Sequence, residues 1–420
     1  MPPPLETIEA TLRRTTEALA AELASPGGAM PAWSDFDWRL ASAAAAAHGV
    51  SPLLCKHSGW MHPPWRRFLE CQHEHVAIRH RKIETLLQQI DDLTRANGLA
   101  AVPLKGAALH ASGVYAPGDR PMADIDLLIR EDDLDRATRL LEGLGYVQCF
   151  DHWRHRVLKP ATGSPPAVLG EHRDTPINIE LHTHIRERLP VSTVDITNRI
   201  YPQAPRPGLN TYPSMGALMG HLLLHAAGNI CARSLRLMHL HDIALLATGM
   251  PAATWKFLWS EGTCWWAWPP LSMVARCYPQ AVPGGVLARL ANDCRPWLRM
   301  ISRRQTLTRV SCSEVWLHAF PGLEWARGPA EAVRFIANRV RPPAEKKRER
   351  ADMLRTQLWL HDQDWVTAPQ RRRILTWLFR RAPRMDTLYV VRMALESTIP
   401  RGEESPGSTG TAELRAIVVK

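Results

Sequence analysis

The sequence predicts a small α+β core embedded in a largely α-helical protein. Long stretches on both sides of this core carry the three-to-four-residue spacing of amphipathic helices. Short apolar runs and alternating apolar and polar residues are concentrated between residues 99 and 190, where they predict strands. A length of 420 residues exceeds one typical domain, so two or three units are expected.

Five regions follow from these patterns. In chain order we expect an N-terminal helical region, the α+β core, a helical region that packs on the core, a basic helical C-terminal region and a flexible tail. Their bounds are residues 1–98, 99–190, 191–300, 301–399 and 400–420. The tail contains PRGEESPGSTG, a composition typical of flexible segments.

The first helices are predicted at residues 5–24, 35–48 and 65–97. The third is long and ends at Asn97-Gly98, a typical helix stop signal. LAAVPLKG then predicts a buried strand that ends in a glycine turn, and AALHASGVY predicts one short helix. The chain therefore changes from helix to strand near residue 99.

The core continues with ADIDLLI, which predicts a second strand at residues 123–129. EDDLDRATRLLEGLG predicts a helix with Asp132 as its cap. YVQCF, WRHRVLK and PINIELHTHI predict three further strands, and the last alternates strictly between apolar and polar residues. A helix pair is predicted from residue 213 onward, and residues 371–396 predict one basic amphipathic helix.

The composition limits the classes of function and the cellular compartment. A formal net charge of +11 suits an acidic partner such as a nucleotide, a nucleic acid or an anionic membrane face, although biased coding DNA also explains the richness in Arg, Ala and Pro. The eight cysteines include no CxxC pair, which favours reduced thiols without disulfides in a cytoplasmic protein. We expect no signal peptide, and we expect no membrane span because no apolar run has the required length.

Two aspartates stand at alternate positions of the second predicted strand. Alternate strand residues face the same side, so the carboxylates of Asp124 and Asp126 project together. Two ionised carboxylates repel each other, and a cation such as Mg²⁺ removes that cost. Glu180, on the polar face of the alternating strand, is the expected third carboxylate. Three carboxylates can hold the two metals of phosphoryl transfer, whereas a bare D-x-D is also compatible with a solvated strand end.

The order of the motifs resembles a known enzyme superfamily. LKGAAL, then Arg120, DIDLLI, GLGY and IELH resemble the nucleotidyltransferases that have a polymerase-β-like palm. More narrowly, the chain resembles a poorly characterised bacterial group whose signature runs LKG…R…DiDlLv…DlH. The resemblance covers roughly residues 65–250. It implies a nucleotidyltransferase palm, which is a small mixed β-sheet with flanking helices, and Mg²⁺ or Mn²⁺ as the cofactor.

The resemblance also implies roles for particular residues. Asp124 and Asp126 match the catalytic metal-binding pair, and Glu180 stands where the third carboxylate is usually aspartate. Gly106 matches the glycine turn that approaches the phosphates. Ala107 follows it in place of the usual serine, so one phosphate hydrogen bond is missing. Glu180 can in addition help to deprotonate the acceptor.

Further residues are candidates for binding the nucleotide. Lys105 can replace the missing serine by its charge, Arg120 is a candidate phosphate or structural anchor, and His182 shares a strand face with Glu180. Each also has a structural alternative, such as an ion pair for Arg120. The candidates for the acceptor side lie on the predicted helix pair and are His225, Arg236 and Asp242.

These features predict an enzyme that uses Mg²⁺ or Mn²⁺ to transfer a nucleoside monophosphate from an NTP, such as ATP, to a hydroxyl group, with release of pyrophosphate. The acceptor would be a small molecule, a peptide or an RNA. A second interpretation is a metal-dependent glycosyltransferase that uses a nucleotide sugar to modify a peptide natural product, since D-x-D also grips such diphosphates. A third is a non-catalytic nucleic-acid-binding protein that uses the basic C-terminal half.

Overall fold

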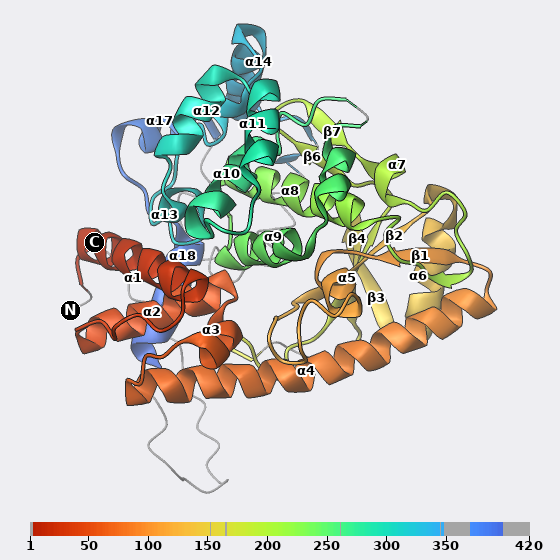
Figure 1. The fold of residues 1–420 in the computed structure, drawn as a ribbon, viewed down its shortest axis with the longest axis horizontal. Helices are drawn as coiled ribbons and strands as arrows, with labels where there is room; N and C mark the ends of the chain where they lie inside the picture. Colours follow the sequence, from red (N-terminus) through yellow and green to blue (C-terminus); the bar gives the residue numbers. More distant parts are fainter. Residues whose placement is uncertain are drawn as a thin grey trace, which may run out of the picture.

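A mixed six-stranded sheet lies on the right-hand side of the protein in Figure 1, with helices packed on both of its faces. The computed structural model describes residues 3–151, 153–163, 166–260, 262–344, 346–347 and 370–397. The predicted class, an α+β core within a largely helical protein, is confirmed. The predicted flexible tail, residues 400–420, lies outside the described residues.

Four helices precede the sheet: α1 (Leu5–Ala24), α2 (Asp35–His48), α3 (Ser51–His57) and α4 (Pro63–Ala96). The predicted helices at 5–24 and 35–48 are confirmed, and a reciprocal capping box between Ser34 and Asp37 begins α2. α4 starts two residues earlier than predicted, because its first two positions are prolines, which suit a first helical turn. It runs beneath both the N-terminal helices and the sheet (Figure 1).

The strands of the sheet follow the order β3-β4-β5-β2-β1-β8, and β5 pairs in parallel with β2. Their bounds are β1 (Ala100–Pro103), β2 (Asp124–Ile129), β3 (Tyr146–Asp151), β4 (His155–Pro160), β5 (Asn178–His182) and β8 (Gly208–Leu209). All five predicted strands are present. β8 has only two residues, too few for a periodic signal, and it carries the sheet beyond the predicted core of residues 99–190.

Short elements connect the strands. They are α5 (Lys105–Ala111), the 3₁₀ turn η1 (Glu131–Asp133), α6 (Leu134–Gly143), and a separate hairpin of β6 (Arg186–Arg188) and β7 (Thr193–Asp195). The prediction that Asp132 caps the helix after β2 is wrong. Asp132 lies inside η1, and the residue at the cap position of α6, Asp133, makes no side-chain cap bond. The 3₁₀ turn supplies the entry to α6 in its place.

Alternation along β2 gives the sheet two distinct faces. Ile125, Leu127 and Ile129 belong to one hydrophobic core together with residues of α4 and α6. Val102 and Leu128 point to the other side, into a larger core that includes residues of α5 and α8. The two aspartates of β2 share this second face, because they alternate with the residues of the first.

The predicted helix pair is α8 (Met215–Ala232) and α9 (Leu237–Gly249). Residues of both helices belong to the larger core, and they approach the second face of the sheet. Among the described residues, α8 is long and apolar enough to cross a membrane by length and composition alone. However, 78% of its 18-residue window is buried inside the fold, as expected of a core helix.

The remaining elements form the second half of the chain. They are α7 (Thr197–Ile200), η2 (Ala252–Leu258), α10 (Trp268–Cys277), α11 (Gly284–Asp293), α12 (Pro296–Arg304), α13 (Leu307–Val310), η3 (Leu323–Trp325), α14 (Pro329–Val340), α17 (Gln370–Phe379) and α18 (Met385–Glu396). The single helix predicted at 371–396 is wrong. It is split into α17 and α18, because Pro383 has no N–H to donate and instead pairs in a β-bridge with Trp316. α18 then returns to the N-terminal half, where Arg39 Nη1 donates to the carbonyl oxygen of Leu395 at 2.6 Å.

Candidate active site

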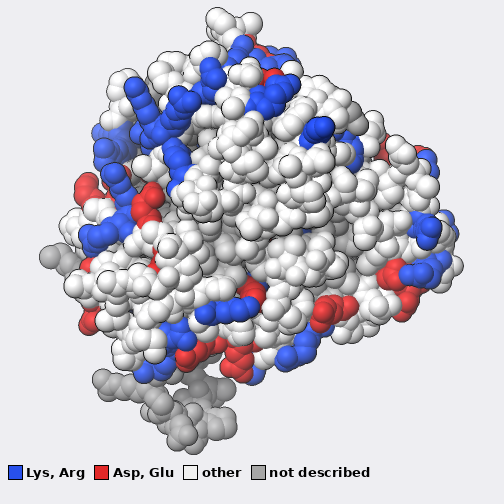
Figure 2. All heavy atoms as spheres, viewed as in Figure 1, with Lys and Arg blue, Asp and Glu red and all other residues white. Residues whose placement is uncertain are grey.

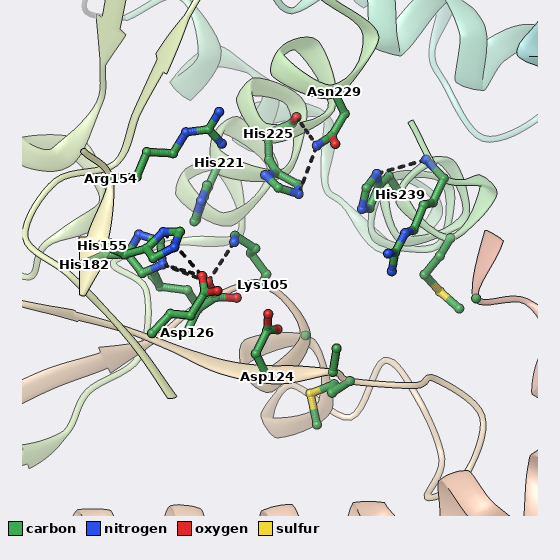
Figure 3. Close-up of a pocket in the computed structure, with 18 of the residues that line it drawn as sticks. Lys105, Asp124, Asp126, Arg154, His155, His182, His221, His225, Asn229 and His239 are labelled. Atoms are coloured by element: carbon green, nitrogen blue, oxygen red, sulfur yellow. Dashed lines mark hydrogen bonds and ion pairs between the residues drawn. The ribbon is translucent and has the colours of Figure 1, made fainter. Parts of the chain in front are cut away.

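The two aspartates and Glu180 lie on neighbouring parallel strands. Asp126 of β2 is directly opposite Glu180 of β5, and Asp124 stands two residues earlier on β2. The three carboxylates therefore line one cavity of about 410 Å³, between this face of the sheet and helices α8 and α9 (Figure 3). The fold thus brings together the three residues that the sequence assigned to metal binding.

Asp126 is held between two side chains. Lys105 Nζ and His182 Nε2 each donate to Asp126 Oδ1 at 2.8 Å (Figure 3). Burial alone would raise the pKa of Asp126, but these partners outweigh it and hold the pKa well below its ordinary value. Burial likewise opposes the charge of Lys105, yet the surrounding carboxylates raise its pKa. The pKa of buried His182 is also raised, by its hydrogen bonds to Asp126 and Glu180.

Asp124 differs from Asp126 because its carboxylate has no hydrogen-bond or ion-pair partner among the residues that the structure describes (Figure 3). Burial raises its pKa to about 7, and repulsion from Asp126 and Glu180 adds to the increase. A carboxylate that loses water without gaining a partner is costly unless a cation reaches it. Three carboxylates that face one cavity, one of them unpaired, are a donor set that fits a divalent metal ion.

The turn that carries Lys105 packs closely against the strand of the aspartates. Lys105 has a φ of +45°, in the left-handed region that residues other than glycine seldom adopt. Gly106 follows in the first turn of α5 and lines the cavity. A Cβ on Gly106 would collide with the Arg120 guanidinium and would lie 2.9 Å from Met122 Cγ. Close packing is therefore a sufficient reason for glycine at this position.

Arg120 is anchored by a buried carboxylate of α9. Its Nε and Nη2 donate to the two oxygens of Asp242, both at 2.8 Å, and Tyr115 Oη donates to Asp242 Oδ1 at 2.7 Å. Burial opposes ionisation of Asp242, but Arg120 outweighs it and lowers the pKa of this carboxyl. Arg120 lines the cavity, whereas Asp242 lies behind it and does not. The pair ties α9 to the segment that enters β2.

A polar stripe on α8 forms the opposite wall of the cavity. His221, His225 and Asn229 are spaced four residues apart, so they share one face of an otherwise apolar helix. His221 Nδ1 is hydrogen-bonded to Tyr212 Oη at 2.7 Å, and His225 Nε2 to Asn229 Nδ2 at 3.1 Å. Burial and the nearby Lys105 charge hold the pKa values of both histidines well below the ordinary value.

Arg236 completes this wall from the start of α9. Its side chain is exposed and lines the cavity, and its backbone N–H donates to His239 Nδ1 at 3.3 Å. Of the three candidates for the acceptor side, His225 and Arg236 therefore face the cavity, while Asp242 serves as the partner of Arg120.

A comparison with models of protein families identifies the family of this chain. A family model described as uncharacterised nucleotidyltransferase matches residues 34–282, more than half of the chain. The chain belongs to this nucleotidyltransferase family. The match includes every site residue described above, from Lys105 to Asp242. Comparisons with curated proteins and with solved structures gave no match.

The cavity of this nucleotidyltransferase contains residues that the sequence analysis did not single out. His155 of β4 is opposite His182 of β5, and its Nδ1 lies 3.4 Å from Glu180 Oε2. Arg154 Nη1 donates to Glu187 Oε1 of β6 at 2.9 Å. These positions depend on strand register and on an unpredicted hairpin, for which the sequence carries no clear signal. The stripe on α8 had a signal, since polar residues four apart interrupt an apolar helix.

Proposed function

We propose that this nucleotidyltransferase moves a nucleoside monophosphate from an NTP to a hydroxyl group in a reaction that depends on Mg²⁺ or Mn²⁺. The observation that supports the proposal most is the unpaired carboxylate of Asp124, which faces the same cavity as Asp126 and Glu180. A pocket that gathers three carboxylates and leaves one without a partner is costly for a protein that does not bind a cation there.

In this proposal Asp124, Asp126 and Glu180 would hold the metal ion. Bound there, Mg²⁺ supplies charge neutralisation for the triphosphate and lowers the pKa of the acceptor hydroxyl. Lys105, whose ammonium group is 2.8 Å from Asp126 on the cavity wall, adds a positive charge within reach of the same phosphates. His182 orients Asp126 through its 2.8 Å hydrogen bond.

The reaction proposed here balances as a simple substitution at phosphorus. The acceptor oxygen forms a bond to the α-phosphorus, the bond from that phosphorus to the bridging oxygen breaks, and pyrophosphate leaves with the electron pair. The hydroxyl proton passes to a base, and Glu180 is placed for this role on the cavity wall. His155 Nδ1 and His182 Nε2 lie 3.4 and 3.7 Å from Glu180 Oε2.

The acceptor is proposed to enter through a second cavity of about 990 Å³. This cavity shares Arg154, Glu187 and Arg236 with the first, so the two cavities are neighbours. Among the described residues, its lining contains eight Lys or Arg side chains and two carboxylates. Basic side chains also gather on the surface over α12 and α17, as Figure 2 shows. This excess of positive charge favours an anionic acceptor.

Arginine and tryptophan side chains are paired in the second cavity. The Arg188 guanidinium lies 4.2 Å from the ring centre of Trp153, and that of Arg373 lies 4.8 Å from the ring centre of Trp377. Stacked guanidinium groups present a rigid fork of N–H donors that matches phosphate. A phosphate-bearing RNA or peptide is therefore the acceptor class that we propose.

The test is an incubation of the full-length protein with Mg²⁺ or Mn²⁺, each labelled NTP, and either single-stranded RNA or phosphopeptide. The proposal expects pyrophosphate release and label transfer by the wild type, and neither by the Asp124→Asn/Asp126→Asn variant. A nucleotide-sugar arm addresses glycosyl transfer, in which UDP would be released without pyrophosphate. A non-catalytic nucleic-acid-binding protein would bind RNA in a salt-sensitive way that Asp124→Asn does not change.

A further inference from the structure

Imidazole nitrogens stand beside the carboxylates on the same face of the sheet. His155 of β4 is directly opposite His182 of β5, and Glu180 stands two residues before His182. Asp126 of β2 is directly opposite Glu180. Directly opposed residues and alternate residues of neighbouring strands share a face, so three strands present these four side chains as one patch. Figure 3 shows His155, His182 and Asp126 together on one wall of the cavity.

The spacing of the donor atoms in this patch is that of ligands around a single ion. One donor atom from each of His155, Glu180 and His182 lies within 4.8 Å of the others. His155 Nδ1 and His182 Nε2 are 3.4 and 3.7 Å from Glu180 Oε2, and His182 Nε2 is 2.8 Å from Asp126 Oδ1. Metal–ligand bonds of about 2.0–2.2 Å place neighbouring ligand atoms roughly 2.8–3.6 Å apart. Small side-chain rotations would bring the donors of His155, Glu180 and His182 to one ion, with Asp126, which also accepts from Lys105, beside it.

We infer that this pocket selects a first-row transition metal ion, such as Mn²⁺, Co²⁺ or Zn²⁺, over Mg²⁺, with His155 and His182 as nitrogen ligands. Mg²⁺ is a hard ion that prefers oxygen ligands and keeps several of its waters, whereas imidazole suits transition metals. A pocket with carboxylates alone would show a weaker preference. The inference rests on the proposed metal site and is independent of which nucleotide or acceptor is used.

Carboxylates alone would be sufficient to hold Mg²⁺. Ligation of a transition metal ion accounts for the two imidazoles of His155 and His182 beside them. A metal ion held by His182 would take the place of the hydrogen bond that His182 makes to Asp126 in the metal-free protein. Asp124, which stands two residues from Asp126 and has no partner among the described residues, would supply a further oxygen ligand to the same metal site. The pocket therefore offers both nitrogen and oxygen donors on one wall.

Direct metal binding tests the selectivity. Titration calorimetry would measure Co²⁺ and Mg²⁺ binding to the full-length wild type, to His155→Gln and to the control His239→Gln. His239 also lines the cavity but lies on α9, away from the carboxylates (Figure 3). The wild type should bind Co²⁺ at least about tenfold more tightly than Mg²⁺. His155→Gln should weaken Co²⁺ at least about tenfold and change Mg²⁺ affinity by less than about twofold, while His239→Gln changes neither.

Two results for His155→Gln would overturn the inference. One is Co²⁺ affinity that His155→Gln leaves within about twofold of the wild type, and the other is equal loss of Co²⁺ and Mg²⁺. Thermal unfolding of each variant without metal confirms that the fold is intact, and His182→Gln should show the same split between the two ions. Equal binding of both ions by the wild type would also overturn the inference but would leave the proposed function intact. Failure of the wild type to bind either ion would also contradict the proposed function.

Discussion

Replacing Asp124 with asparagine should stabilise the metal-free protein while abolishing its activity. The Asp124 carboxylate lies close to Asp126 and Glu180 and has no partner among the described residues. Asparagine has nearly the same shape and carries no charge. In the absence of a divalent ion, the wild type bears the cost of this charge and the variant does not.

The size of the effect follows from the pKa of the carboxyl. Folding raises the pKa of Asp124 from 3.8 to about 7, through burial and then repulsion from Asp126 and Glu180. One pKa unit corresponds to about 1.4 kcal/mol, so the cost at pH 8 is at most about 4 kcal/mol. Because the pKa of Asp124 is higher in the folded state than in the unfolded state, the free energy of unfolding of the wild type decreases as the pH rises from 3.8 to 7. With an unfolding entropy of about 2.1 cal/mol/K per residue, 4 kcal/mol corresponds to roughly 5 °C in Tm for this chain.

Thermal unfolding at pH 8 and pH 5 in EDTA measures this effect. The variant should have the higher Tm at pH 8, the difference should shrink at pH 5, and added Mg²⁺ should raise the Tm of the wild type more than that of the variant. Asp132→Asn is the matched control, since Asp132 is exposed in η1 and its replacement should change stability by less than about 0.5 kcal/mol. A Tm for Asp124→Asn at or below that of the wild type at pH 8 in EDTA would refute the reasoning.

Three further predictions concern the scaffold of the site. Asp242→Ala removes the bidentate partner of buried Arg120 and should destabilise the protein by about 3–5 kcal/mol in denaturant unfolding; a loss below about 1 kcal/mol would contradict the anchoring role. His48 has its pKa lowered to about 3 by burial, so only the unfolded state takes up its proton between pH 6.5 and 3. The wild type should therefore lose about 1.4 kcal/mol per pH unit below 6.5 from this group, and His48→Asn should show a shallower pH dependence; equal slopes would exclude the assignment. Gly228→Ala places a methyl group 2.6 Å from the buried Glu187 carboxylate of β6, so it should lower both Tm and activity. Gly249→Ala is the control, because nothing lies within 4 Å of its added methyl group. Equal changes in the two variants would contradict the close approach of Gly228 to Glu187.

The elements with a long local period could be predicted from the sequence. α1 and α2 have the predicted bounds, because apolar residues every three or four positions select one buried helix face without knowledge of the partner. The strand of Asp124 and Asp126 was predictable for a related reason. Alternation assigned its apolar residues to one face and its carboxylates to the other, and the structure has this arrangement.

The short elements depend on contacts that the sequence does not display. β8 and the β6–β7 hairpin have two or three residues per strand, so pairing with a distant strand defines them. The break between α17 and α18 contains Pro383, although apolar residues at helical spacing continue on either side of it. Asp132 was the expected cap of α6, yet a 3₁₀ turn replaced the cap.

The residues of the candidate site also fall into two groups: those that local sequence patterns indicate and those that only tertiary contacts bring into place. The D-x-D motif and the alternating strand of Glu180 pointed to the carboxylates directly, since both are local patterns. The partnership of Arg120 with Asp242 joins residues more than one hundred positions apart, and the place of His155 depends on the register of β4 against β5. Such contacts are set by tertiary packing, and a single sequence contains no record of them.

The central claim is that Asp124, Asp126 and Glu180 together hold a divalent ion beside the nucleotide. Crystals grown with Mn²⁺ and a non-hydrolysable NTP analogue would test it through the anomalous signal of the metal. The account predicts an anomalous peak within bonding distance of these carboxylates and of the analogue's phosphates. Nucleotide bound elsewhere, or nucleotide in this cavity with no metal peak beside the three carboxylates, would contradict it.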